Sequence, residues 1–431
     1  MNPRKQISFI VGIFLITCNA FADTLSLKEF IHNACRQNPQ QKIAASTVAS
    51  KRASVESSRS SLLPQVNGTA GISSSQSPGQ TVRGGGGDLL NSTSIGIRAD
   101  ALLYDFGASP LRYKASGKAL ESALLDSVSA MASFILNART AYFNYLLSQR
   151  LLTVNEDAMK QANLHFDQAT ILFKVGKTAQ IEVTKARVDV ANAEVNLIHA
   201  KNAVDLAKVQ MEVVAGAPLV DPLVLTDSLG AIEDSPVLDE ALKTALQKRP
   251  EINSLRSDVE SAKLLLKAAR AAYLPSLSAS GDAGWSSSDN ASIHGPDFST
   301  APDWSIGAAL SVPIYQGGRI SASIKQAASA LQQTEAQLDA LQLTVSQQVK
   351  QYFLQEKEAS QRISATKTLI EQAQESLTLS QERFRAGVAF SIEITDAEVT
   401  LANARASNVQ ALFDYHVAHA NLLLAIGSLN E

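Results

Sequence analysis

The stretch LYDFG at residues 103–107 returns as IYQGG at residues 314–318, 211 positions later. The same offset relates Pro64 to Pro275, and it holds along the chain without a gap. A repeat this long is a duplicated, domain-sized unit, because the units of solenoid proteins are only about 20–50 residues long. The chain is therefore expected to have two halves of the same architecture.

Each repeat opens with two predicted helices. The first covers residues 27–38 or 238–249 and ends before Pro39 or Pro250, since the residue before a proline disfavours the helical conformation. The second is rich in Ala, Ser, Lys and Arg, and it runs to about residue 62 or 273. The next proline in each repeat ends this helix and marks the start of a strand.

The sequence also predicts one β-hairpin in each repeat, at about residues 64–106 and about residues 275–315. Apolar residues alternate with polar ones there, which is the period-two pattern of a strand with one apolar face. The apolar positions include Val66, Ala70, Ile72, Ile95, Ile97, Leu103, Leu277, Ile306, Leu310 and Val312.

A long proline-free stretch follows each hairpin, at about residues 111–173 and 321–384, with heptad-like spacing of apolar residues. At 1.5 Å per residue, about 60 residues make a helix of about 90 Å. Gly176 and Gly387 break this helix, and a helix of about 38 residues returns. The second helix and the returning helix together match the long one in length. The sequence thus predicts a mainly α fold of long antiparallel coiled coils with a small β portion.

The first 22 residues predict an export signal. Arg4 and Lys5 precede a short apolar core at residues 7–16, and residues 20–22 (AFA) form a small-x-small cleavage site. The alternative is a lipoprotein signal in which Cys18 is lipidated.

Cleavage would leave a first repeat at residues 23–220, a linker at 221–237 and a second repeat at 238–431. The net charge would move from −3 to −5, which does not suggest a nucleic-acid surface. Cys35 would be the remaining cysteine, so no intramolecular disulfide could form. No uninterrupted run of 18 apolar residues follows the signal, so a membrane-spanning form would have to be a closed β-barrel.

Two hairpins supply four strands, which cannot close a barrel and would leave bare edges. Three chains would supply twelve, so the sequence predicts a trimer. The 11 residues from Trp304 to Tyr315 span about 36 Å as a strand, or about 28 Å across the membrane at a tilt of about 40°. Tyr104, Trp304 and Tyr315 are then candidate aromatic anchors at the membrane interfaces. The alternative is an ordinary soluble sandwich hairpin.

These patterns, in this order and twice over, resemble the TolC-like outer-membrane efflux protein family. The resemblance covers the whole chain after the signal. It is carried by LPQV at residues 63–66, LPSL at 274–277, the two hairpin ends quoted above, FKVG at 173–176 and FRAG at 384–387. It implies a homotrimeric duct with a 12-stranded barrel in the outer membrane and a helical tunnel through the periplasm. It also implies a closed tip, coupled by a periplasmic adaptor to a proton-driven or ABC-type inner-membrane pump.

The resemblance places a ring of acidic residues at the closed tip, and the matching positions are Glu393 and Asp396. Residues three apart share one helix face, so threefold symmetry would gather six carboxylates around the axis and attract cations. The alternative is a solvated helix face. Some family members lock the tip with a tyrosine and an arginine, but Phe384 and Ala389 stand at those positions here.

Gly176 and Gly387 match the family's tip motif that meets the adaptor. A glycine lets another backbone approach closely. The alternative is that each glycine only turns the chain between two helices.

No catalytic, cofactor or metal site is predicted. Gly176-Lys177-Thr178 lacks the first glycine of a phosphate-binding loop, and His416 and His419 have no third metal ligand at a suitable spacing. The predicted function is that of a non-enzymatic outer-membrane channel for small molecules, drugs or metals. Two alternatives are the outer-membrane component of type I protein secretion and a periplasmic coiled-coil scaffold without a pore.

Overall fold

The computed structural model describes residues 24–76, 89–220, 223–227, 229, 236–289, 293–299, 301–386, 388 and 390–429. The predicted export signal with Cys18, the tip residue Gly387 and the latch position Ala389 lie outside these ranges.

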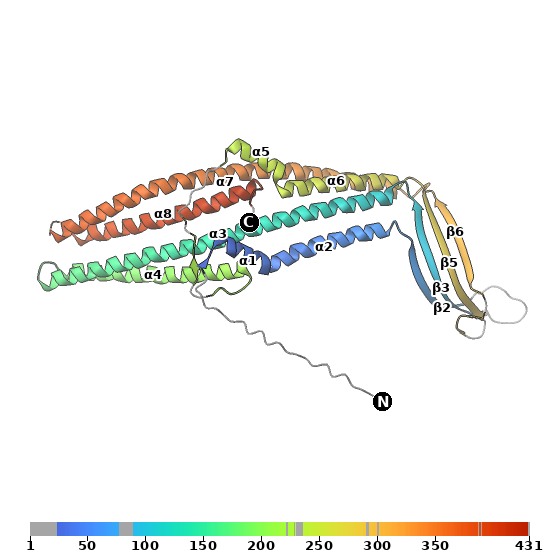
Figure 1. Cartoon of the computed structure of the whole chain (residues 1–431), viewed down its shortest axis with the longest axis horizontal. Helices are drawn as coiled ribbons and strands as arrows, with labels where there is room; N and C mark the ends of the chain where they lie inside the picture. Colours follow the sequence, from blue (N-terminus) through green and yellow to red (C-terminus); the bar gives the residue numbers. More distant parts are fainter. Residues whose placement is uncertain are drawn as a thin grey trace, which may run out of the picture.

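The described chain is an elongated body with long helices at one end and a four-stranded sheet at the other (Figure 1). The helices are α1 (Leu27–Gln37), α2 (Pro39–Ser60), α3 (Ala108–Lys174), α4 (Gln180–Ala215), α5 (Leu238–Lys248), α6 (Pro250–Ala271), α7 (Arg319–Arg385) and α8 (Ser391–Ala425). The strands are β1 (Thr24–Leu25), β2 (Gln65–Gln76), β3 (Leu89–Tyr104), β4 (Val224–Leu225), β5 (Ser276–Asp289) and β6 (Asp303–Ser311). Each helix from α5 to α8 begins 211 positions after its counterpart, so the duplication predicted from the sequence is confirmed.

Two antiparallel coiled coils form the body. The long helices α3 and α7 have 67 residues each, which is about 100 Å of helix. In the first repeat α2 packs along one half of α3 and α4 along the other half (Figure 1). In the second repeat α6 and α8 divide α7 in the same way, and α6 also packs against α3. This contact of α6 with α3 joins the two repeats.

A tight joint connects the first two helices of each repeat to the end of its returning helix. Asn38 caps α2 by accepting a hydrogen bond from the backbone N–H of Gln40, and its Nδ2 donates to the carbonyl oxygen of Val214 at 2.9 Å. Gly216 has a φ of 73°, and a Cβ there would lie 3.2 Å from the Cα of Asn38. Gly427 repeats this arrangement with a φ of 72°, and its Cβ would lie 3.1 Å from the Cα of the residue that matches Asn38, Arg249. Both repeats have glycine at this position, where the backbone approach leaves no room for a side chain.

The largest core lies where α1, α3 and α4 meet at mid-body. Phe30, Tyr142 and Met211 are buried there, and burying such a side chain fully stabilises the fold by about 1.5–3 kcal/mol. The hydroxyl of Tyr142 lies 2.9 Å from both the carbonyl oxygen of Leu25 and Oδ2 of Asp227, so β1 and the stretch after β4 are tied to α3. One stretch of α3 is long and apolar enough to cross a membrane, but α3 lies in the helical body and supplies much of this core.

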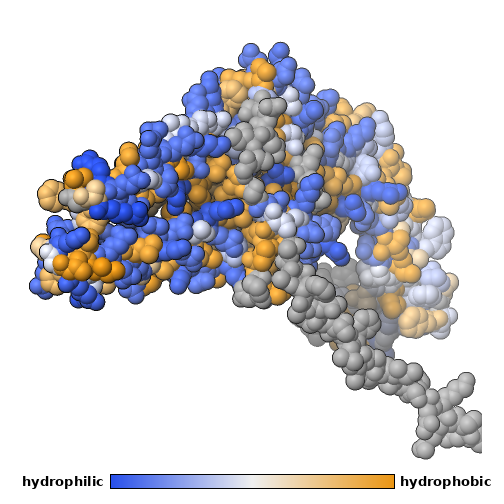
Figure 2. Space-filling view, turned by 60° about the vertical axis from the view of Figure 1, so that its left-hand side comes forward, coloured by the Kyte–Doolittle hydropathy of each residue, from blue (hydrophilic) through white to orange (hydrophobic). Residues whose placement is uncertain are grey.

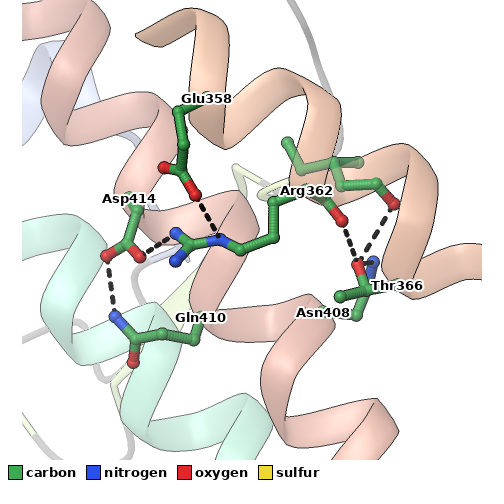
Figure 3. A network of polar contacts seen from close by, with 7 residues as sticks. Glu358, Arg362, Thr366, Asn408, Gln410 and Asp414 are labelled. Atoms are coloured by element: carbon green, nitrogen blue, oxygen red, sulfur yellow. Dashed lines mark hydrogen bonds and ion pairs between the residues drawn. The ribbon is translucent and has the colours of Figure 1, made fainter. Parts of the chain in front are cut away.

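A polar network holds α7 and α8 together further along the coil (Figure 3). Arg362 lies between Glu358, at 3.6 Å, and Asp414 of α8, and Asp414 also accepts a hydrogen bond from Gln410 at 2.8 Å. Beside it, Nδ2 of Asn408 donates to Oγ1 of Thr366 at 2.9 Å (Figure 3). Partly exposed ion pairs contribute only about 0–1 kcal/mol each. The network therefore contributes more to the register of the two helices than to stability.

The main sheet has the strand order β2-β3-β5-β6, and every pair in it is antiparallel. The pairing of β3 with β5 joins the hairpins of the two repeats, while β2 and β6 form the edges. One face carries residues such as Val66, Ile97, Ala283 and Trp304, and the other face carries mostly Ser, Asn, Thr, Asp and Gly. The alternation predicted for the strands is thus present across the whole sheet.

Two details differ from the sequence prediction. The register of β3 shifts between Leu102 and Tyr104, so Leu103 is an extra residue and Tyr104, rather than Leu103, pairs with Leu277 on the apolar face. The last strand ends at Ser311 instead of continuing to Tyr315. The physical reason is Pro313, which has no N–H to donate to a ladder.

Candidate functional site

The free ends of the two coils lie at the opposite end of the body from the sheet (Figure 1). The 67 residues of α3 and of α7 place these ends about 100 Å from the sheet, at 1.5 Å per residue. The first coil turns at residues 175–179, where Gly176 has a φ of 73° and open space around the position of a Cβ. Gly176 thus turns the chain and also leaves room for another backbone. Its counterpart Gly387 lies outside the described residues.

The predicted aperture residues Glu393 and Asp396 lie in the first two turns of α8. Asp396 is exposed, and Glu393 is half-buried with its Oε2 3.7 Å from Nη2 of Arg383 on α7. The contact with Arg383 is long and the arginine is more than half exposed, so it neutralises Glu393 only weakly.

The matching turns of α4 have a different charge pattern. Lys185 stands at the position of Asp396, and its Nζ lies 3.0 Å from Oε1 of Glu182. Two further charges differ as well, since Arg187 and Asp189 of α4 match Glu398 and Thr400 of α8. The start of α4 is therefore balanced in charge, and the start of α8 is acidic.

Polar contacts join the two coils just behind the tips. Nε2 of the buried His165 on α3 lies 2.9 Å from Oγ of Ser391, the first residue of α8. Oγ1 of Thr395 donates to Oδ2 of Asp189 at 3.1 Å. Phe384 packs its ring against His165 at 5.9 Å between centroids, so it lies inside the junction. Phe384 is one of the two positions considered above for a latch.

A cavity of about 260 Å³ lies beside these contacts, between α3, α4 and α8. Glu398 and Asp189 both line it. Burial, with the nearby charge of Asp189, raises the pKa of Glu398 to about 7. Burial lowers the pKa of His165. Two titratable groups whose pKa values burial shifts thus lie in the junction between the coils.

Sequence reasoning missed His165, Asp189 and Glu398. His165 lies in an ordinary helical stretch, and no local motif marks it. A signal did exist for Glu398, because the repeat offset aligns it with Arg187 and exposes a reversal of charge. His419, considered above for a metal site, instead places Nδ1 2.6 Å from Oε1 of the buried Glu356.

The three aromatic anchor candidates are all mostly exposed: Tyr104, Trp304 and Tyr315. Tyr104 ends β3 next to the helices, whereas Trp304 lies near the start of β6, in register with Ala283 and Ile97. β2, β3 and β5 extend beyond that row, so Trp304 lies in the middle of the apolar face rather than at its far end. Tyr315 follows the end of β6 and does not belong to the sheet.

Comparison with known proteins agrees with this architecture. The chain is 25% identical to the outer membrane protein TolC of Escherichia coli over 438 residues, which cover 99% of this chain and 87% of that protein. It is 26% identical to the alkaline protease secretion protein AprF of Pseudomonas aeruginosa over 446 residues, which cover 100% of this chain and 90% of that protein. The crystal structure of the Campylobacter jejuni CmeC outer membrane channel superposes with a TM-score of 0.80 at 19% identity, covering 93% of this chain and 85% of that one.

The sequence model of the outer membrane efflux protein family matches residues 30–217 and 241–428. These two matches begin 211 positions apart, which is the offset of the repeat. Together they include nearly all of the helices and the whole four-stranded main sheet. The chain therefore belongs to the outer membrane efflux protein family.

Proposed function

We propose that this chain assembles as a homotrimer into a duct that conducts exported cargo across the periplasm and the outer membrane. The export signal is removed after residue 22, and the apolar face of the sheet faces lipid. A partner at the inner membrane supplies the energy, and the duct itself performs no catalysis.

The observation that carries the proposal is the unequal burial of two matched helices. The second-repeat helix α6 packs between α3 and α7 and buries residues such as Ile252 and Val259. Its first-repeat counterpart α2 has no buried residue among its 22, while Leu343 and Leu354 of α7 are exposed. If α7 of a neighbouring chain covered α2, every copy of the repeat would have the same surroundings.

Strand pairing in the sheet leads to the same arrangement, in which each chain contacts the next one around a closed ring. Within the chain, the hairpin of the first repeat pairs with the hairpin of the second through β3 and β5. By the repeat, β6 would pair with β2 of the next chain, which closes the edges. A barrel of about eight strands is filled by side chains, so two chains would leave no duct, whereas twelve strands leave a lumen.

Small molecules, drugs or metals are the proposed cargo, with protein secretion as the second candidate. TolC is named as an outer membrane protein, and AprF as an alkaline protease secretion protein. The comparison with AprF keeps protein secretion open. The inner-membrane partner is a proton-driven pump for the first cargo class and an ABC-type exporter for the second.

The assembly is tested by mass measurement of the purified protein in mild detergent, followed by planar-bilayer recording. We expect the mass of three chains and stable single-channel currents. A stable monomer, or a trimer that never conducts, would contradict the duct and favour a periplasmic scaffold without a pore.

The coil tips are the proposed contact with a periplasmic adaptor protein. Figure 2 shows apolar side chains at both coil ends, next to hydrophilic side chains. The exposed apolar residues there are Phe173, Val175, Ile181, Val388, Phe390 and Ile392. Such a patch on a protruding end is typical of a protein interface. Gly176 and Gly387 lie in the same turns, where an adaptor backbone would approach them closely.

Replacement of Gly176 and Gly387 by Phe should leave the trimer intact and reduce export in cells. The matched control is Gly295→Phe, because Gly295 lies in the loop between β5 and β6 with open space around it. Unchanged export by the Gly176→Phe, Gly387→Phe double variant would rule out the adaptor role.

Glu393 and Asp396 are the proposed aperture, with six carboxylates around the axis of the trimer.

A further inference from the structure

Arg98 has a position in the sheet that the proposed duct does not yet explain. Strand register places it in a row with Asn67 of β2, Asp282 of β5 and Ser305 of β6. Residues that pair across strands share a face, so this row lies on the polar face, opposite Ile97 and Trp304. In a barrel with its apolar face toward lipid, the row faces the lumen.

Among the described strand residues, Arg98 is the sole positive charge. Three carboxylates share its face: Asp100, Asp282 and Asp303. Nε of Arg98 lies 3.1 Å from Oδ2 of Asp100, while Asp282 accepts a hydrogen bond from Oγ of Ser305 at 2.8 Å. The polar face of each chain thus has a net charge of −2, which would be −3 without Arg98.

The sheet also leaves space in front of these charges. The neighbouring row contains Gly96 and Gly284 as register partners, and a Cβ on Gly96 would lie 2.9 Å from the carbonyl oxygen of Ala283. Both positions therefore stay without side chains, and a hollow of about 330 Å³ opens beside Arg98, Asp282 and Asp303. The Arg98 side chain is 54% exposed, so its charge is available to ions in the lumen.

We propose that Arg98 is a selectivity-determining residue of the barrel, which moderates the cation preference that the surrounding lumen carboxylates impose. The proposal rests on the trimeric duct argued above. It assigns a second charge filter to the membrane end of the duct, at the opposite end from the acidic tip.

Barrel size decides the conditions under which this filter acts. Twelve strands spaced about 4.8 Å apart and tilted by about 40° make a backbone circle about 24 Å across. The radius of this circle, about 12 Å, exceeds the Debye length of about 8 Å at physiological ionic strength. At 0.01 M salt the Debye length is about 30 Å, so the charges then act across the whole lumen. The effect should therefore be large in dilute salt and vanish in 1 M salt.

The test is the reversal potential of single channels in a KCl gradient around 10 mM. Glu393→Ala and Asp396→Ala are present in every protein compared, so that the tip does not dominate selectivity. Arg98→Gln should raise the cation-to-anion permeability ratio about twofold, and Asp282→Asn should lower it by a similar factor. Arg98→Lys keeps the charge and should match the unchanged barrel.

Equal reversal potentials for Arg98→Gln and Arg98→Lys in conducting channels would overturn the filter and leave the duct intact. The filter would also be overturned if Arg98→Gln lowered the temperature at which trimers dissociate and left the reversal potential unchanged, because Arg98 would then have only a structural role. If the reference protein, with Arg98 and Asp282 intact, formed no conducting trimer, that result would contradict the duct and the filter together.

Discussion

At matched positions near their free ends, α4 carries Lys185 and Arg187 where α8 carries Asp396 and Glu398. The backbones at these positions are alike, since both helices follow a 67-residue partner. At the opposite ends of the same helices, Gly216 and its counterpart Gly427 are the same residue, with φ angles of 73° and 72°, and each approaches the backbone of a matched residue. Only a glycine fits the joint, whereas a charge on an exposed helix turn contributes little to stability. The two repeats have therefore kept their geometry at the joint and diverged in charge at the tip.

The largest effect should come from breaking the joint, equally in both repeats. Gly216→Val and Gly427→Val each place a branched side chain at positive φ against backbone, so each should cost about 2–3 kcal/mol of unfolding free energy. Denaturant unfolding of the purified protein measures both. The control is Gly117→Ala within α3, where nothing lies within 4 Å of the new Cβ. A clear difference between the two valine variants would show that the repeats are not equivalent at the joint.

Neutralising the charges at the tips should change ion selectivity in the second repeat and not in the first. Glu393→Ala with Asp396→Ala removes the unbalanced charge of α8 and should lower cation selectivity, on the order of tenfold if the six carboxylates line the aperture. It should also relieve block by divalent ions from the periplasmic side. The matched control is Glu182→Ala with Lys185→Ala, which removes a balanced pair. Planar-bilayer recording in asymmetric salt measures all of these effects, and equal reversal potentials for the two double variants would place the aperture elsewhere.

A smaller, pH-dependent difference should separate Glu398 from Arg187. The pKa of Glu398 is raised from 4.5 to about 7, so its packed environment favours the protonated form. The contribution of Glu398 to the free energy of unfolding is fully present below about pH 4.5, and it is lost as the pH rises through about 7 and the carboxyl group ionises in the folded protein. Glu398→Gln should therefore stabilise the protein at pH 8, by about 1 kcal/mol after solvent screening, and hardly at pH 5.

Unfolding midpoints at pH 5 and pH 8 give this measurement. Arg187→Gln is the control, because an arginine does not titrate in this range. A gain from Glu398→Gln that is the same at both pH values would show that packing, and not titration, is responsible.

The smallest effect is expected for the ion pair of the first tip, in which Lys185 is exposed and Glu182 is half-buried. Lys185→Ala removes the 3.0 Å contact with Glu182, and a partly exposed pair three residues apart on a helix contributes less than about 0.5 kcal/mol. The unfolding free energy should be nearly unchanged. A loss above about 1 kcal/mol would mean that the charges hold this tip together and that it is not free to change them.

Most of the fold could be predicted from the sequence, because prolines and glycines mark the ends of nearly every element. Pro39 is the first residue of α2, and Gly216 is the C-cap of α4. The bulge at Leu103 and the early end of β6 were missed. Alternation shows that a strand exists, but a single extra residue reverses which side chain lies on which face.

The candidate site was only partly accessible to sequence reasoning. Glu393 and Asp396 lie in the first two turns of α8, near the tip, where their place in the sequence puts them. The contact between His165 and Ser391 spans 226 positions and joins different repeats, so no local pattern could indicate it. Contacts of this kind depend on how the two coils pack, which periodicity does not encode.

The open edges β2 and β6 have a thermodynamic consequence. An isolated chain presents unpaired backbone groups on both edges, an apolar sheet face and an α2 without buried residues. A folded monomer of this kind is unfavourable and prone to pair with the wrong edge. In the proposed trimer, stability follows mass action: the concentration of assembled trimer varies with the third power of the free-chain concentration, so stability rises with protein concentration and does not belong to one chain alone. Folding and assembly are in this sense a single reaction.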